Sequence, residues 1–301
     1  MAGSDYLNPF LDCRGRRFAW GERTYIMGVL NVSPESFSGD GFMDPDTAVE
    51  QGKRFVEEGA DILDVGGEST RPLYTAKMEA STWGGAAGRV ASPIDVQVEL
   101  GRVLPVIQRL AKAVKVPISI DTYKAEVARQ ALDAGANMVN DVWGLKTAPE
   151  LAAVAAQYGA PLVLMHNQSG TEYADLMTDI RRGLEASVRQ ALDAGVRPEK
   201  IILDPGFGFG KLPAHNLEIL RCLRDLKELG YPILLGTSRK STIGVVLGLP
   251  VRERLEGTAA TVAIGIANGA DIVRVHDVKA MARVARMADA IVRGWMPEPK
   301  E

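Results

Sequence analysis

The chain alternates short apolar segments with amphipathic helical stretches almost from end to end, and this alternation limits the folds open to it. Each apolar segment is a continuous run rather than a period-two pattern, which is typical of a parallel strand buried on both faces. Eight such candidate strands occur, at residues 25–31, 61–65, 117–121, 138–142, 161–166, 200–204, 232–236 and 271–275.

The segments between these strands have helical spacing. Three of the turns that lead into a strand read Gly-Ala-Asp or Gly-Ala-Asn, beginning at Gly59, Gly135 and Gly269, where a glycine ends the preceding helix in a left-handed cap. The clearest apolar stripes are Leu100, Val103, Leu104, Ile107 and Leu110 in one stretch, and Met281, Val284, Ala285, Ala288 and Ile291 in another.

Eight strand–helix units in about 250 residues match a (β/α)8 barrel, the α/β fold called the TIM barrel, better than an open doubly wound sheet. An open sheet would usually show fewer units or a second domain. We therefore predict a single domain, with the barrel over residues 25–295 and an N-terminal segment, residues 1–24, that caps the barrel floor.

The segment from Pro72 to Ser92 departs from this regular spacing. It follows the second predicted strand, is rich in small residues and has no clear periodicity. A loop of about 20 residues is uncommon in a compact domain and often forms a lid or a disordered stretch. A tolerated insertion without function is the alternative that the sequence leaves open.

Charge and hydropathy exclude several classes of function. The 301 residues carry a formal net charge of −3, so no global positive field would attract nucleic acid or an anionic membrane surface. The apolar runs are far shorter than the roughly 20 residues that a membrane helix needs, and no secretory signal pattern opens the chain. Cys13 and Cys222 suggest neither a disulfide framework nor a metal site. We expect a cytoplasmic protein that binds small molecules.

Every predicted strand ends in a polar or charged group. In a (β/α)8 barrel the catalytic groups gather at the carboxyl ends of the strands. Any one of these residues alone could be a helix cap or a loop residue, but eight together indicate a functional rim. In chain order they are Asn31, Asp64 with Glu68, Asp121, Asn140 with Asp141, His166, Asp204, Ser238 to Lys240, and Arg274 with His276.

Part of this rim offers hydrogen-bond acceptors. Asp121, Asn140 and Asp204 supply carboxylates and an amide, which suit a flat heterocycle that bears several N–H groups. A hydrogen bond to a charged group contributes about 1.5–3 kcal/mol, so two carboxylates that pair with ring donors would dominate the recognition of such a ligand.

The other part of the rim is cationic. Lys240, Arg274 and His276 supply positive charge for an anion, and the last two can face one pocket because they lie two residues apart at a strand end. A pyrophosphate would need such a cluster, together with Mg2+, which prefers oxygen ligands and usually keeps several waters. Asn31 could provide one of these oxygens.

Other patterns resemble known sites but lack the required spacing. The segment Gly206-Phe-Gly-Phe-Gly-Lys211 resembles a phosphate-binding loop, yet Pro205 stands at the first glycine position and Leu212 replaces the required Ser or Thr. The three histidines lie on separate segments without zinc-site spacing, and no Ser-His-Asp arrangement can be read from the spacing. Arg254 lies too far from a strand end to receive a role.

Taken together, these segments resemble the signatures of dihydropteroate synthases, from about Tyr25 to Val292. The motifs GESTRP at 67–72 and SRKS at 238–241 are highly specific, whereas Asp-Pro-Gly and Ile-Asp-Thr are shared with pterin-binding methyltransferases. The matching segments are 27–38 (MGVLNVSPESFS), 64–72 (DVGGESTRP), 120–123 (IDTY), 140–141 (ND), 164–166 (LMH), 204–211 (DPGFGFGK), 236–241 (GTSRKS) and 274–276 (RVH).

The resemblance implies a role for each residue that matches a motif, and it implies three adjoining subsites. The residues implied to bind pterin are Asp121, Asn140, Met165, Asp204 and Lys240. Those implied to bind pyrophosphate are Asn31, which would also hold Mg2+, Arg274 and His276. Those implied to bind p-aminobenzoate are Phe37, Thr70, Pro72, Arg239 and Ser241, and those implied to act in catalysis are Lys240, Asp40 and Asp121.

The reaction implied by the resemblance is substitution at the methylene carbon of dihydropterin pyrophosphate. Pyrophosphate leaves first, and the aniline nitrogen of p-aminobenzoate then attacks. Cations for a leaving anion, carboxylates near a ring that becomes cationic and no strong nucleophile agree with this reaction, whose catalysis would be positional and electrostatic. Family members are generally dimers, so the resemblance also implies a homodimer.

The chain departs from the family pattern in four places. An extra residue, Gly39, precedes Asp40 in the first loop, and the long insertion follows Pro72. Thr242 occupies a position commonly held by Phe, and Leu212 one commonly held by Thr. Three of these departures lie on the p-aminobenzoate side, so we hypothesise altered sulfonamide binding, with neutral drift as the alternative.

Two other functions are weighed against the synthase reaction. A pterin-binding methyltransferase would present methyltetrahydrofolate to a corrinoid protein, but the motifs SRKS and STRP argue against it. A synthase paralogue that binds pterin with weak or no catalysis would usually have lost the lysine of SRKS or the Asp-Pro-Gly glycine, and both are intact here.

Overall fold

The structure is a computed structural model that describes residues 6–33, 44–69 and 93–295. Its centre is an eight-stranded parallel sheet with the strand order β8-β7-β6-β5-β4-β3-β10-β9. A bridge between Leu203 and Ile233 brings β8 beside β9, so the sheet forms a nearly closed barrel. The strands are β3 (Tyr25–Asn31), β4 (Ile62–Gly66), β5 (Ile118–Asp121), β6 (Met138–Asp141), β7 (Leu162–Met165), β8 (Ile201–Asp204), β9 (Leu234–Leu235) and β10 (Ile272–Val275).

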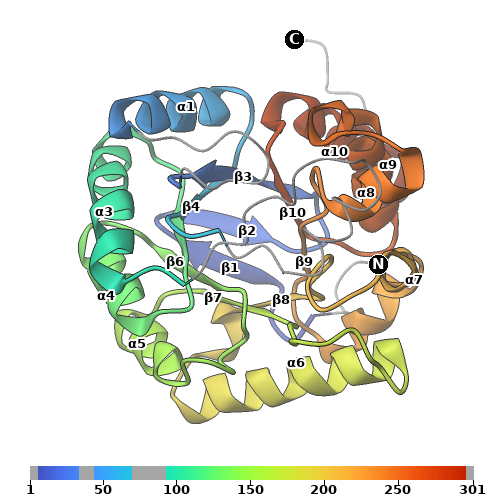
Figure 1. The fold of residues 1–301 in the computed structure, drawn as a ribbon, viewed down its shortest axis with the longest axis horizontal. Helices are drawn as coiled ribbons and strands as arrows, with labels where there is room; N and C mark the ends of the chain where they lie inside the picture. The colour runs from blue at the N-terminus through green and yellow to red at the C-terminus, as the bar shows by residue number, and fades with distance from the viewer. Residues whose placement is uncertain (1–5, 34–43, 70–92, 296–301) are drawn as a thin grey trace.

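Helices surround this barrel as an outer layer, as Figure 1 shows, and the predicted TIM barrel is confirmed. No helix within the described ranges is long and apolar enough to cross a membrane. The helices are α1 (Pro45–Glu57), α3 (Val96–Ala113), α4 (Ala125–Asp133), α5 (Glu150–Tyr158), α6 (Leu176–Asp193), α7 (Pro213–Cys222), α8 (Ser241–Leu247), α9 (Leu255–Ala267) and α10 (Val278–Arg293), with short 3-10 turns at Pro198–Lys200, Leu223–Leu229 and Val251–Glu253.

The barrel strands lie where the apolar runs predict them, with each end shifted by no more than about two residues, which is the usual uncertainty of such boundaries. Gly59, Gly135 and Gly269 have φ values of 108°, 111° and 102°, so the glycines that end the preceding helices adopt positive φ as predicted. The segment 72–92, which the sequence predicts to be a loop, lies outside the described residues.

One position of the predicted helix stripes is wrong. Ile291 is 71% exposed rather than buried, although Met281, Ala285 and Ala288 of the same stripe are buried. The last turn of α10 directs Asp289 and Arg293 inward instead. Asp289 accepts hydrogen bonds from Thr24, and Arg293 donates one to the carbonyl of Gly21. A polar contact with the segment before β3 therefore replaces the apolar contact that the spacing predicts.

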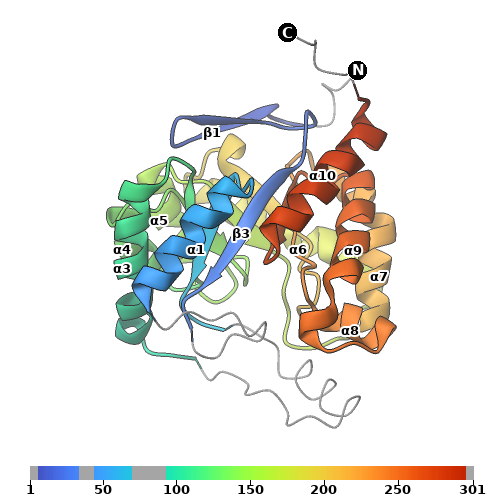
Figure 2. The same ribbon diagram turned by 90° about the horizontal axis from the view of Figure 1, so that it is seen from above.

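A hairpin that the sequence did not predict precedes the barrel. Strands β1 (Phe10–Cys13) and β2 (Arg16–Ala19) pair antiparallel, and Arg14 and Gly15 connect them with φ values of 48° and 71°. Two positive φ values in a two-residue connection are typical of a type I′ turn. The hairpin lies across one end of the barrel (Figure 2). Its buried side chains cluster with Tyr25, Met27, Ile62, Met138, Val163, Ile202, Leu234 and Ile272 of the barrel strands.

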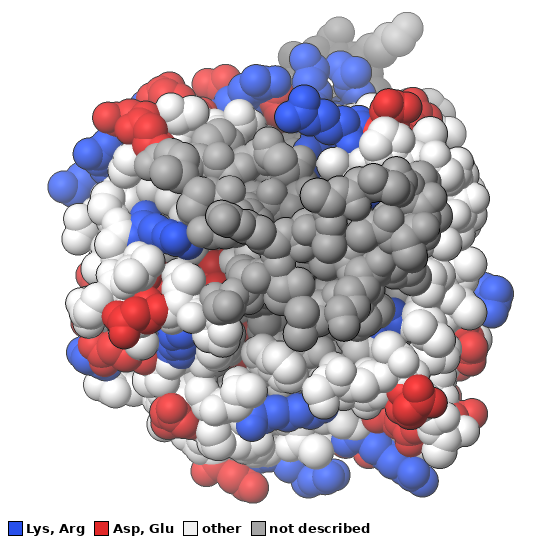
Figure 3. All heavy atoms as spheres, in the orientation of Figure 1, with Lys and Arg blue, Asp and Glu red and all other residues white. Residues whose placement is uncertain are grey.

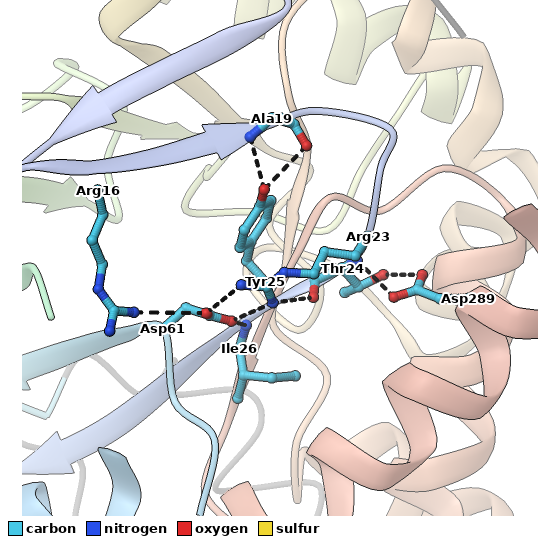
Figure 4. Close-up of polar contacts among 8 residues, drawn as sticks. All are labelled: Arg16, Ala19, Arg23, Thr24, Tyr25, Ile26, Asp61 and Asp289. Atoms are coloured by element: carbon cyan, nitrogen blue, oxygen red, sulfur yellow. Dashed lines mark hydrogen bonds and ion pairs between the residues drawn. The ribbon is translucent and has the colours of Figure 1, made fainter. Parts of the chain in front are cut away.

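Polar groups join this hairpin and the start of β3 to the rest of the floor, as Figure 4 shows. Asp61 accepts two hydrogen bonds from Arg23, at 2.6 and 2.9 Å, and one from the backbone N–H of Ile26. The hydroxyl of Tyr25 accepts from the N–H of Ala19 at 2.7 Å. These groups close the amino end of the barrel, so the carboxyl end is the open end at which polar side chains can meet a ligand.

Replacing Phe18 with alanine tests how much this floor stabilises the barrel. Phe18 is 1% exposed and packs on Tyr25 at a ring-centroid distance of 4.9 Å. Because the substitution opens a cavity, we expect the free energy of unfolding to fall by about 3–5 kcal/mol, measured by urea denaturation. Phe10→Ala in the same hairpin is the control. Phe10 is 40% exposed, and an equal loss in both variants would contradict this account of the floor.

Candidate active site

Four neighbouring strands end at one level, and this brings polar residues far apart in sequence onto one rim. The strand register pairs Asn31 with Gly66, Gly66 with Asp121, and Asp121 with Asn140. A Cβ atom on Gly66 would lie 3.5 Å from the Cβ atom of Asp121, an ordinary van der Waals contact. The ends of β4 and β5 are therefore direct neighbours at the mouth of the barrel.

Arg274, on β10, connects this rim across the barrel mouth. Its Nε atom lies 2.6 Å from Oδ2 of Asp64, and its Nη2 atom lies 2.7 Å from Oδ2 of Asp121. Asn140 also donates to Oδ2 of Asp64, at 3.2 Å. One guanidinium thus joins residues of β10, β4, β5 and β6 in a single network.

Burial strengthens the electrostatic interactions between Arg274 and the two carboxylates of this network. Asp64 is 0% exposed. Burial on its own would lower the pKa of Arg274, but Asp64 and Asp121 outweigh it and raise that pKa, so the guanidinium stays charged. Burial also raises the pKa of Asp121, an effect that Arg274 opposes and Asp64 adds to.

Two carboxylate oxygens of this network remain open. Within the described part of the chain, Oδ1 of Asp64 and Oδ1 of Asp121 are buried and have no hydrogen-bond partner. Buried polar atoms are nearly always hydrogen-bonded in folded proteins. Acceptors that remain unpaired beside a cation are suited to N–H groups of a bound ligand.

A second acidic group lies at the end of β8. The carboxylate of Asp204 accepts a hydrogen bond of 2.7 Å from the N–H of Gly206, and it interacts electrostatically with Lys240. Burial raises the pKa of Asp204, while Lys240 opposes this rise. Conversely, burial lowers the pKa of Lys240 to about 8, against the effect of Asp204.

Lys240 and Arg274 flank the same backbone position. A Cβ atom on Gly236 would lie 3.8 Å from Nζ of Lys240 and 3.7 Å from Cβ of Arg274. Lys240 donates a short hydrogen bond to the carbonyl of Phe207, and its ammonium lies 4.6 Å from the ring centroid of Phe209. The acidic and the cationic residues predicted from the strand ends therefore lie around one mouth.

The turn before α8 carries further predicted residues. Arg239 has a φ of 57° and forms a two-point ion pair with Asp277, at 2.6 and 2.9 Å. The hydroxyl of Ser238 accepts from the N–H of His276 at 3.2 Å and lies 3.0 Å from its Nδ1 atom. Arg239 and His276 both line a cavity of about 320 Å3 that lies against α1. Ser241, the first residue of α8, is buried.

The structure thus brings together most of the described residues that the sequence singles out. Asp121, Asn140, Asp204, Lys240 and Arg274 converge, while Met165 is buried at the end of β7 and pairs in register with Asp204. Asn31 ends β3. The other predicted residues, Phe37, Asp40, Thr70 and Pro72, lie outside the described ranges.

Two residues have roles here that their sequence positions do not indicate. Asp64 ends a predicted strand, but nothing in its spacing shows that it pairs with Arg274, 210 positions later in the chain. The spacing of Ser238 likewise does not indicate its contact with His276. Glu68, also on the predicted rim, instead forms an ion pair of 2.5 Å with Lys124, which lies 2.6 Å from Glu99. That largely buried cluster is structural rather than part of the mouth.

The face shown in Figure 3 carries positive and negative side chains interspersed around its edge, without a single-sign field. This distribution agrees with the small net charge of −3. Within the described ranges, no group of three or more His, Cys, Asp or Glu side chains could hold a metal ion. The charge that matters for an anionic ligand is therefore local, at Lys240 and Arg274.

Comparison with known proteins agrees with this geometry. The family model described as "Pterin binding enzyme" matches residues 27–82 and 83–276. A dihydropteroate synthase of Clostridium beijerinckii is 52% identical over 280 residues, which cover 92% of this chain and 98% of that protein.

Solved structures give the same result. A dihydropteroate synthase of Clostridium difficile, crystallised in the presence of pteroic acid, is 51% identical with a TM-score of 0.82, covering 91% of this chain and 98% of the other. The enzyme of Yersinia pestis, in a sulfonamide drug complex, is 38% identical with a TM-score of 0.85, covering 94% and 98%. The chain therefore belongs to the pterin-binding enzymes and, within them, to the dihydropteroate synthase family.

Proposed function

We propose that this protein condenses 6-hydroxymethyl-7,8-dihydropterin pyrophosphate with p-aminobenzoate to give 7,8-dihydropteroate and pyrophosphate, a transferase reaction of folate biosynthesis. The observation that carries the proposal is the convergence of Asp121, Asn140, Asp204 and Lys240 with Arg274 at one barrel mouth. Membership of the dihydropteroate synthase family supports the same reaction.

In this proposal the acidic side of the mouth binds the pterin ring. Asp204, fixed by the N–H of Gly206, and Asp121, with a buried open oxygen, would accept hydrogen bonds from ring and amino N–H groups. Asn140 can both donate and accept, and Met165 would line the pocket wall beside Asp204. Lys240, the remaining pterin-binding residue, would donate to a ring acceptor.

The cationic side would hold the pyrophosphate. The two ion pairs of Arg274 use two of its five N–H donors, so the guanidinium can still bind an anion while Asp64 and Asp121 fix its orientation. His276, held by Ser238, and Asn31 complete the proposed pyrophosphate site.

Mg2+ fits this donor set as an ion that arrives with the pyrophosphate. It usually takes one or two protein oxygens and completes its octahedron with phosphate oxygens and waters. Asn31 offers one amide oxygen at the end of β3, and the described residues contain no ready-made acidic metal cluster. We propose that Asn31 would hold the ion, which when bound offsets negative charge on the leaving group.

The proposed chemistry needs placement and charge rather than a protein nucleophile. The C–O bond between the methylene carbon and pyrophosphate breaks, and the pyrophosphate oxygen keeps the electron pair. The carboxylates of Asp121 and Asp204 stabilise the cationic ring that remains, and Lys240 and Arg274 stabilise the departing anion. The amine of p-aminobenzoate then forms the new C–N bond and loses a proton. Lys240, Asp121 and Asp40 are the proposed catalytic residues.

The p-aminobenzoate subsite is proposed at the turn before α8, from Arg239 and Ser241, together with Phe37, Thr70 and Pro72. In the described part Arg239 is paired with Asp277, so one side of the guanidinium is already oriented. Thr242, where the family pattern commonly has Phe, is buried and accepts a hydrogen bond from Asn216. A hydroxyl in this place supports the proposal that sulfonamide binding is altered here.

We also propose that the protein is a cytoplasmic homodimer. Apolar side chains that lack cover within the described chain support an interface at α8 and α9. Val246 is 56% exposed, Leu247 47%, Leu255 38% and Ile264 50%. Several exposed apolar residues on neighbouring helices are typical of an interaction surface.

Release of pyrophosphate distinguishes the candidate functions. With Mg2+ and both substrates, we expect stoichiometric formation of dihydropteroate and pyrophosphate, and loss of activity after chelation with EDTA. A pterin-binding methyltransferase would form no dihydropteroate, and a catalytically weak paralogue would bind pterin without releasing pyrophosphate. Either outcome would overturn the proposal.

Asp204→Ala tests the pterin subsite. The variant removes a charged acceptor, so we expect the affinity for 6-hydroxymethylpterin, measured by calorimetry, to fall by about 10-fold to 100-fold. Asp61→Ala is the matched control, because Asp61 is also a buried aspartate next to a barrel strand, but it directly precedes β4 and lies in the floor. Its loss should lower the melting temperature and leave pterin affinity unchanged. Tight binding by Asp204→Ala would refute the assigned role.

The pKa of Lys240 predicts an alkaline limit for the reaction. Because burial lowers this pKa to about 8, the ammonium is present below pH 8 and is lost above it. We expect kcat/KM for dihydropterin pyrophosphate to fall above pH 8, since this parameter reports the protonation state of the free enzyme. Lys240→Arg keeps its charge, so its lower activity should stay constant through this range. A wild-type profile that is flat to pH 10 would contradict the role.

A further inference from the structure

The segment 206–211, which resembles but is not a phosphate-binding loop, folds around the buried Lys211 and the partly buried Lys240. Gly206, Gly208 and Gly210 have φ values of 72°, 86° and 58°. A side chain would strain each of these positions, and a Cβ atom on Gly206 would lie 1.9 Å from the carbonyl oxygen of His166. The alternation of glycine and phenylalanine therefore produces a tightly wound loop directly after Asp204.

The carbonyls of this loop point to different lysines. The carbonyl of Phe207 accepts a hydrogen bond from Lys240 of the proposed pterin site. The carbonyl of Phe209 accepts one of 2.9 Å from Lys211, which is 1% exposed. Lys240 thus binds the loop on the side of the proposed ligand site, and Lys211 binds it on the side of the protein interior.

Lys211 also connects the loop to the neighbouring strand. Its Nζ atom lies 3.2 Å from the carbonyl oxygen of His166 and 3.1 Å from Nδ1 of the same residue, which directly follows β7. A protonated lysine can only donate, so Nδ1 of His166 is then the acceptor and the ring proton is on Nε2. The tautomer of His166 therefore reports on the protonation of Lys211.

A neutral pair of side chains supports the middle of the loop. The N–H of Gly208 donates to Oδ1 of Asn216 at 2.7 Å, and Nδ2 of Asn216 donates to the hydroxyl of Thr242 at 2.9 Å. Thr242 lies two residues after Lys240, at the start of α8. The loop is thus held at its end by Lys211 and at its centre by Asn216.

We propose that Lys211 is a positioning residue of the pterin site, which fixes the Phe207 carbonyl against Lys240 and the Gly206 N–H against Asp204 without itself touching the substrate. This inference rests on the proposed function, because it assigns a role within the same site. Its basis is geometric: the hydrogen bonds of Lys211 described above join the loop to the end of β7, and the loop contacts both Asp204 and Lys240.

The surroundings of Lys211 explain why a charge at this position matters. Among the described residues, the charged or titratable groups around it include Asp204, Lys240, Lys146, His166 and Tyr173, whose ring centroid lies 6.0 Å from Nζ. Burial lowers the pKa of Lys211 to about 7, with Asp204 opposing this shift. Burial likewise lowers the pKa of His166 to about 3, so this histidine is already neutral at the pH values below 7 at which Lys211 is protonated.

Lys211→Met tests the proposal, because methionine keeps much of the side-chain volume and removes the donor. We expect KM for dihydropterin pyrophosphate to rise about tenfold or more, since the carbonyls of His166 and Phe209 lose a donor and the loop shifts. KM for p-aminobenzoate should change less than twofold, because the loop is joined to Thr242, on that side of the site, at Gly208 through Asn216 rather than through Lys211. An unchanged pterin KM in a folded variant would overturn the proposal.

Lys227→Met is the matched control. Lys227 is also a largely buried lysine with a carboxylate partner, Asp271 at 2.9 Å, but it lies in the barrel floor. This variant should lose thermal stability and keep both KM values. Should Lys211→Met change both KM values equally, as a general loss of structure would, the positioning role would be refuted.

Two further measurements apply if Lys211→Met does not fold. Lys211→Gln is uncharged and one bond shorter, so it cannot reach all three acceptors of Lys211 and should show the same split between the two KM values. In the wild-type protein, 15N NMR should show Nδ1 of His166 as an unprotonated acceptor at pH 6. Its resonance should shift when 6-hydroxymethylpterin binds and stay in place when p-aminobenzoate is added alone. A resonance that pterin leaves unmoved would overturn the inference.

Failure of this inference is distinguishable from failure of the proposed function. A wild-type protein that forms no dihydropteroate would refute the proposed function, whatever the result for the Lys211 variants. If the wild-type protein forms dihydropteroate and the Lys211→Met variant has a normal KM for dihydropterin pyrophosphate, only the positioning role is refuted.

Discussion

The site depends on one buried electrostatic contact, the pairing of Arg274 with both Asp64 and Asp121. A guanidinium inside a barrel is costly to bury unless carboxylates offset its charge, and carboxylates are equally costly without it. Each group therefore requires the others, and together they set the positions of four strand ends. Asn140 extends the network by donating to Asp64. The proposed ligand contacts are built on this arrangement, since the oxygens left open belong to the same carboxylates.

The two ends of the barrel use polar groups for opposite purposes. At the floor, Asp61 and Asp271 accept hydrogen bonds from backbone N–H groups and pair with cations, so their acceptors are engaged within the protein. At the mouth, Oδ1 of Asp64 and Oδ1 of Asp121 have no hydrogen-bond partner among the described residues, and burial lowers the pKa of Lys240 against the effect of Asp204. Because the hairpin covers the floor, the mouth is the end of the barrel at which a ligand can meet these side chains.

Local pattern was sufficient to predict the barrel, because continuous apolar runs and glycine-ended helices are local features. It also predicted several residues that lie at the mouth, since strand ends follow from strand boundaries, but Glu68 of the predicted rim pairs with Lys124 instead. The pairing of Arg274 with Asp64 was not predictable, because it depends on which strands become neighbours and on side-chain direction. The hairpin was missed because its strands are four residues long and carry arginines. The prediction for Ile291 is wrong because apolar periodicity cannot show that Asp289 and Arg293 make polar contacts in the last turn of α10.

Gly206 has a consequence for how this protein can change over time. A Cβ atom there would lie 1.9 Å from the carbonyl oxygen of His166, and its φ of 72° is one that side chains rarely adopt. Most amino-acid exchanges at this position would therefore damage the loop itself. A compound bound at the proposed pterin half of the mouth would lie beside this loop and beside the mutually dependent charges of Arg274, Asp64 and Asp121. Such positions offer fewer viable substitutions than a surface made of independent side chains.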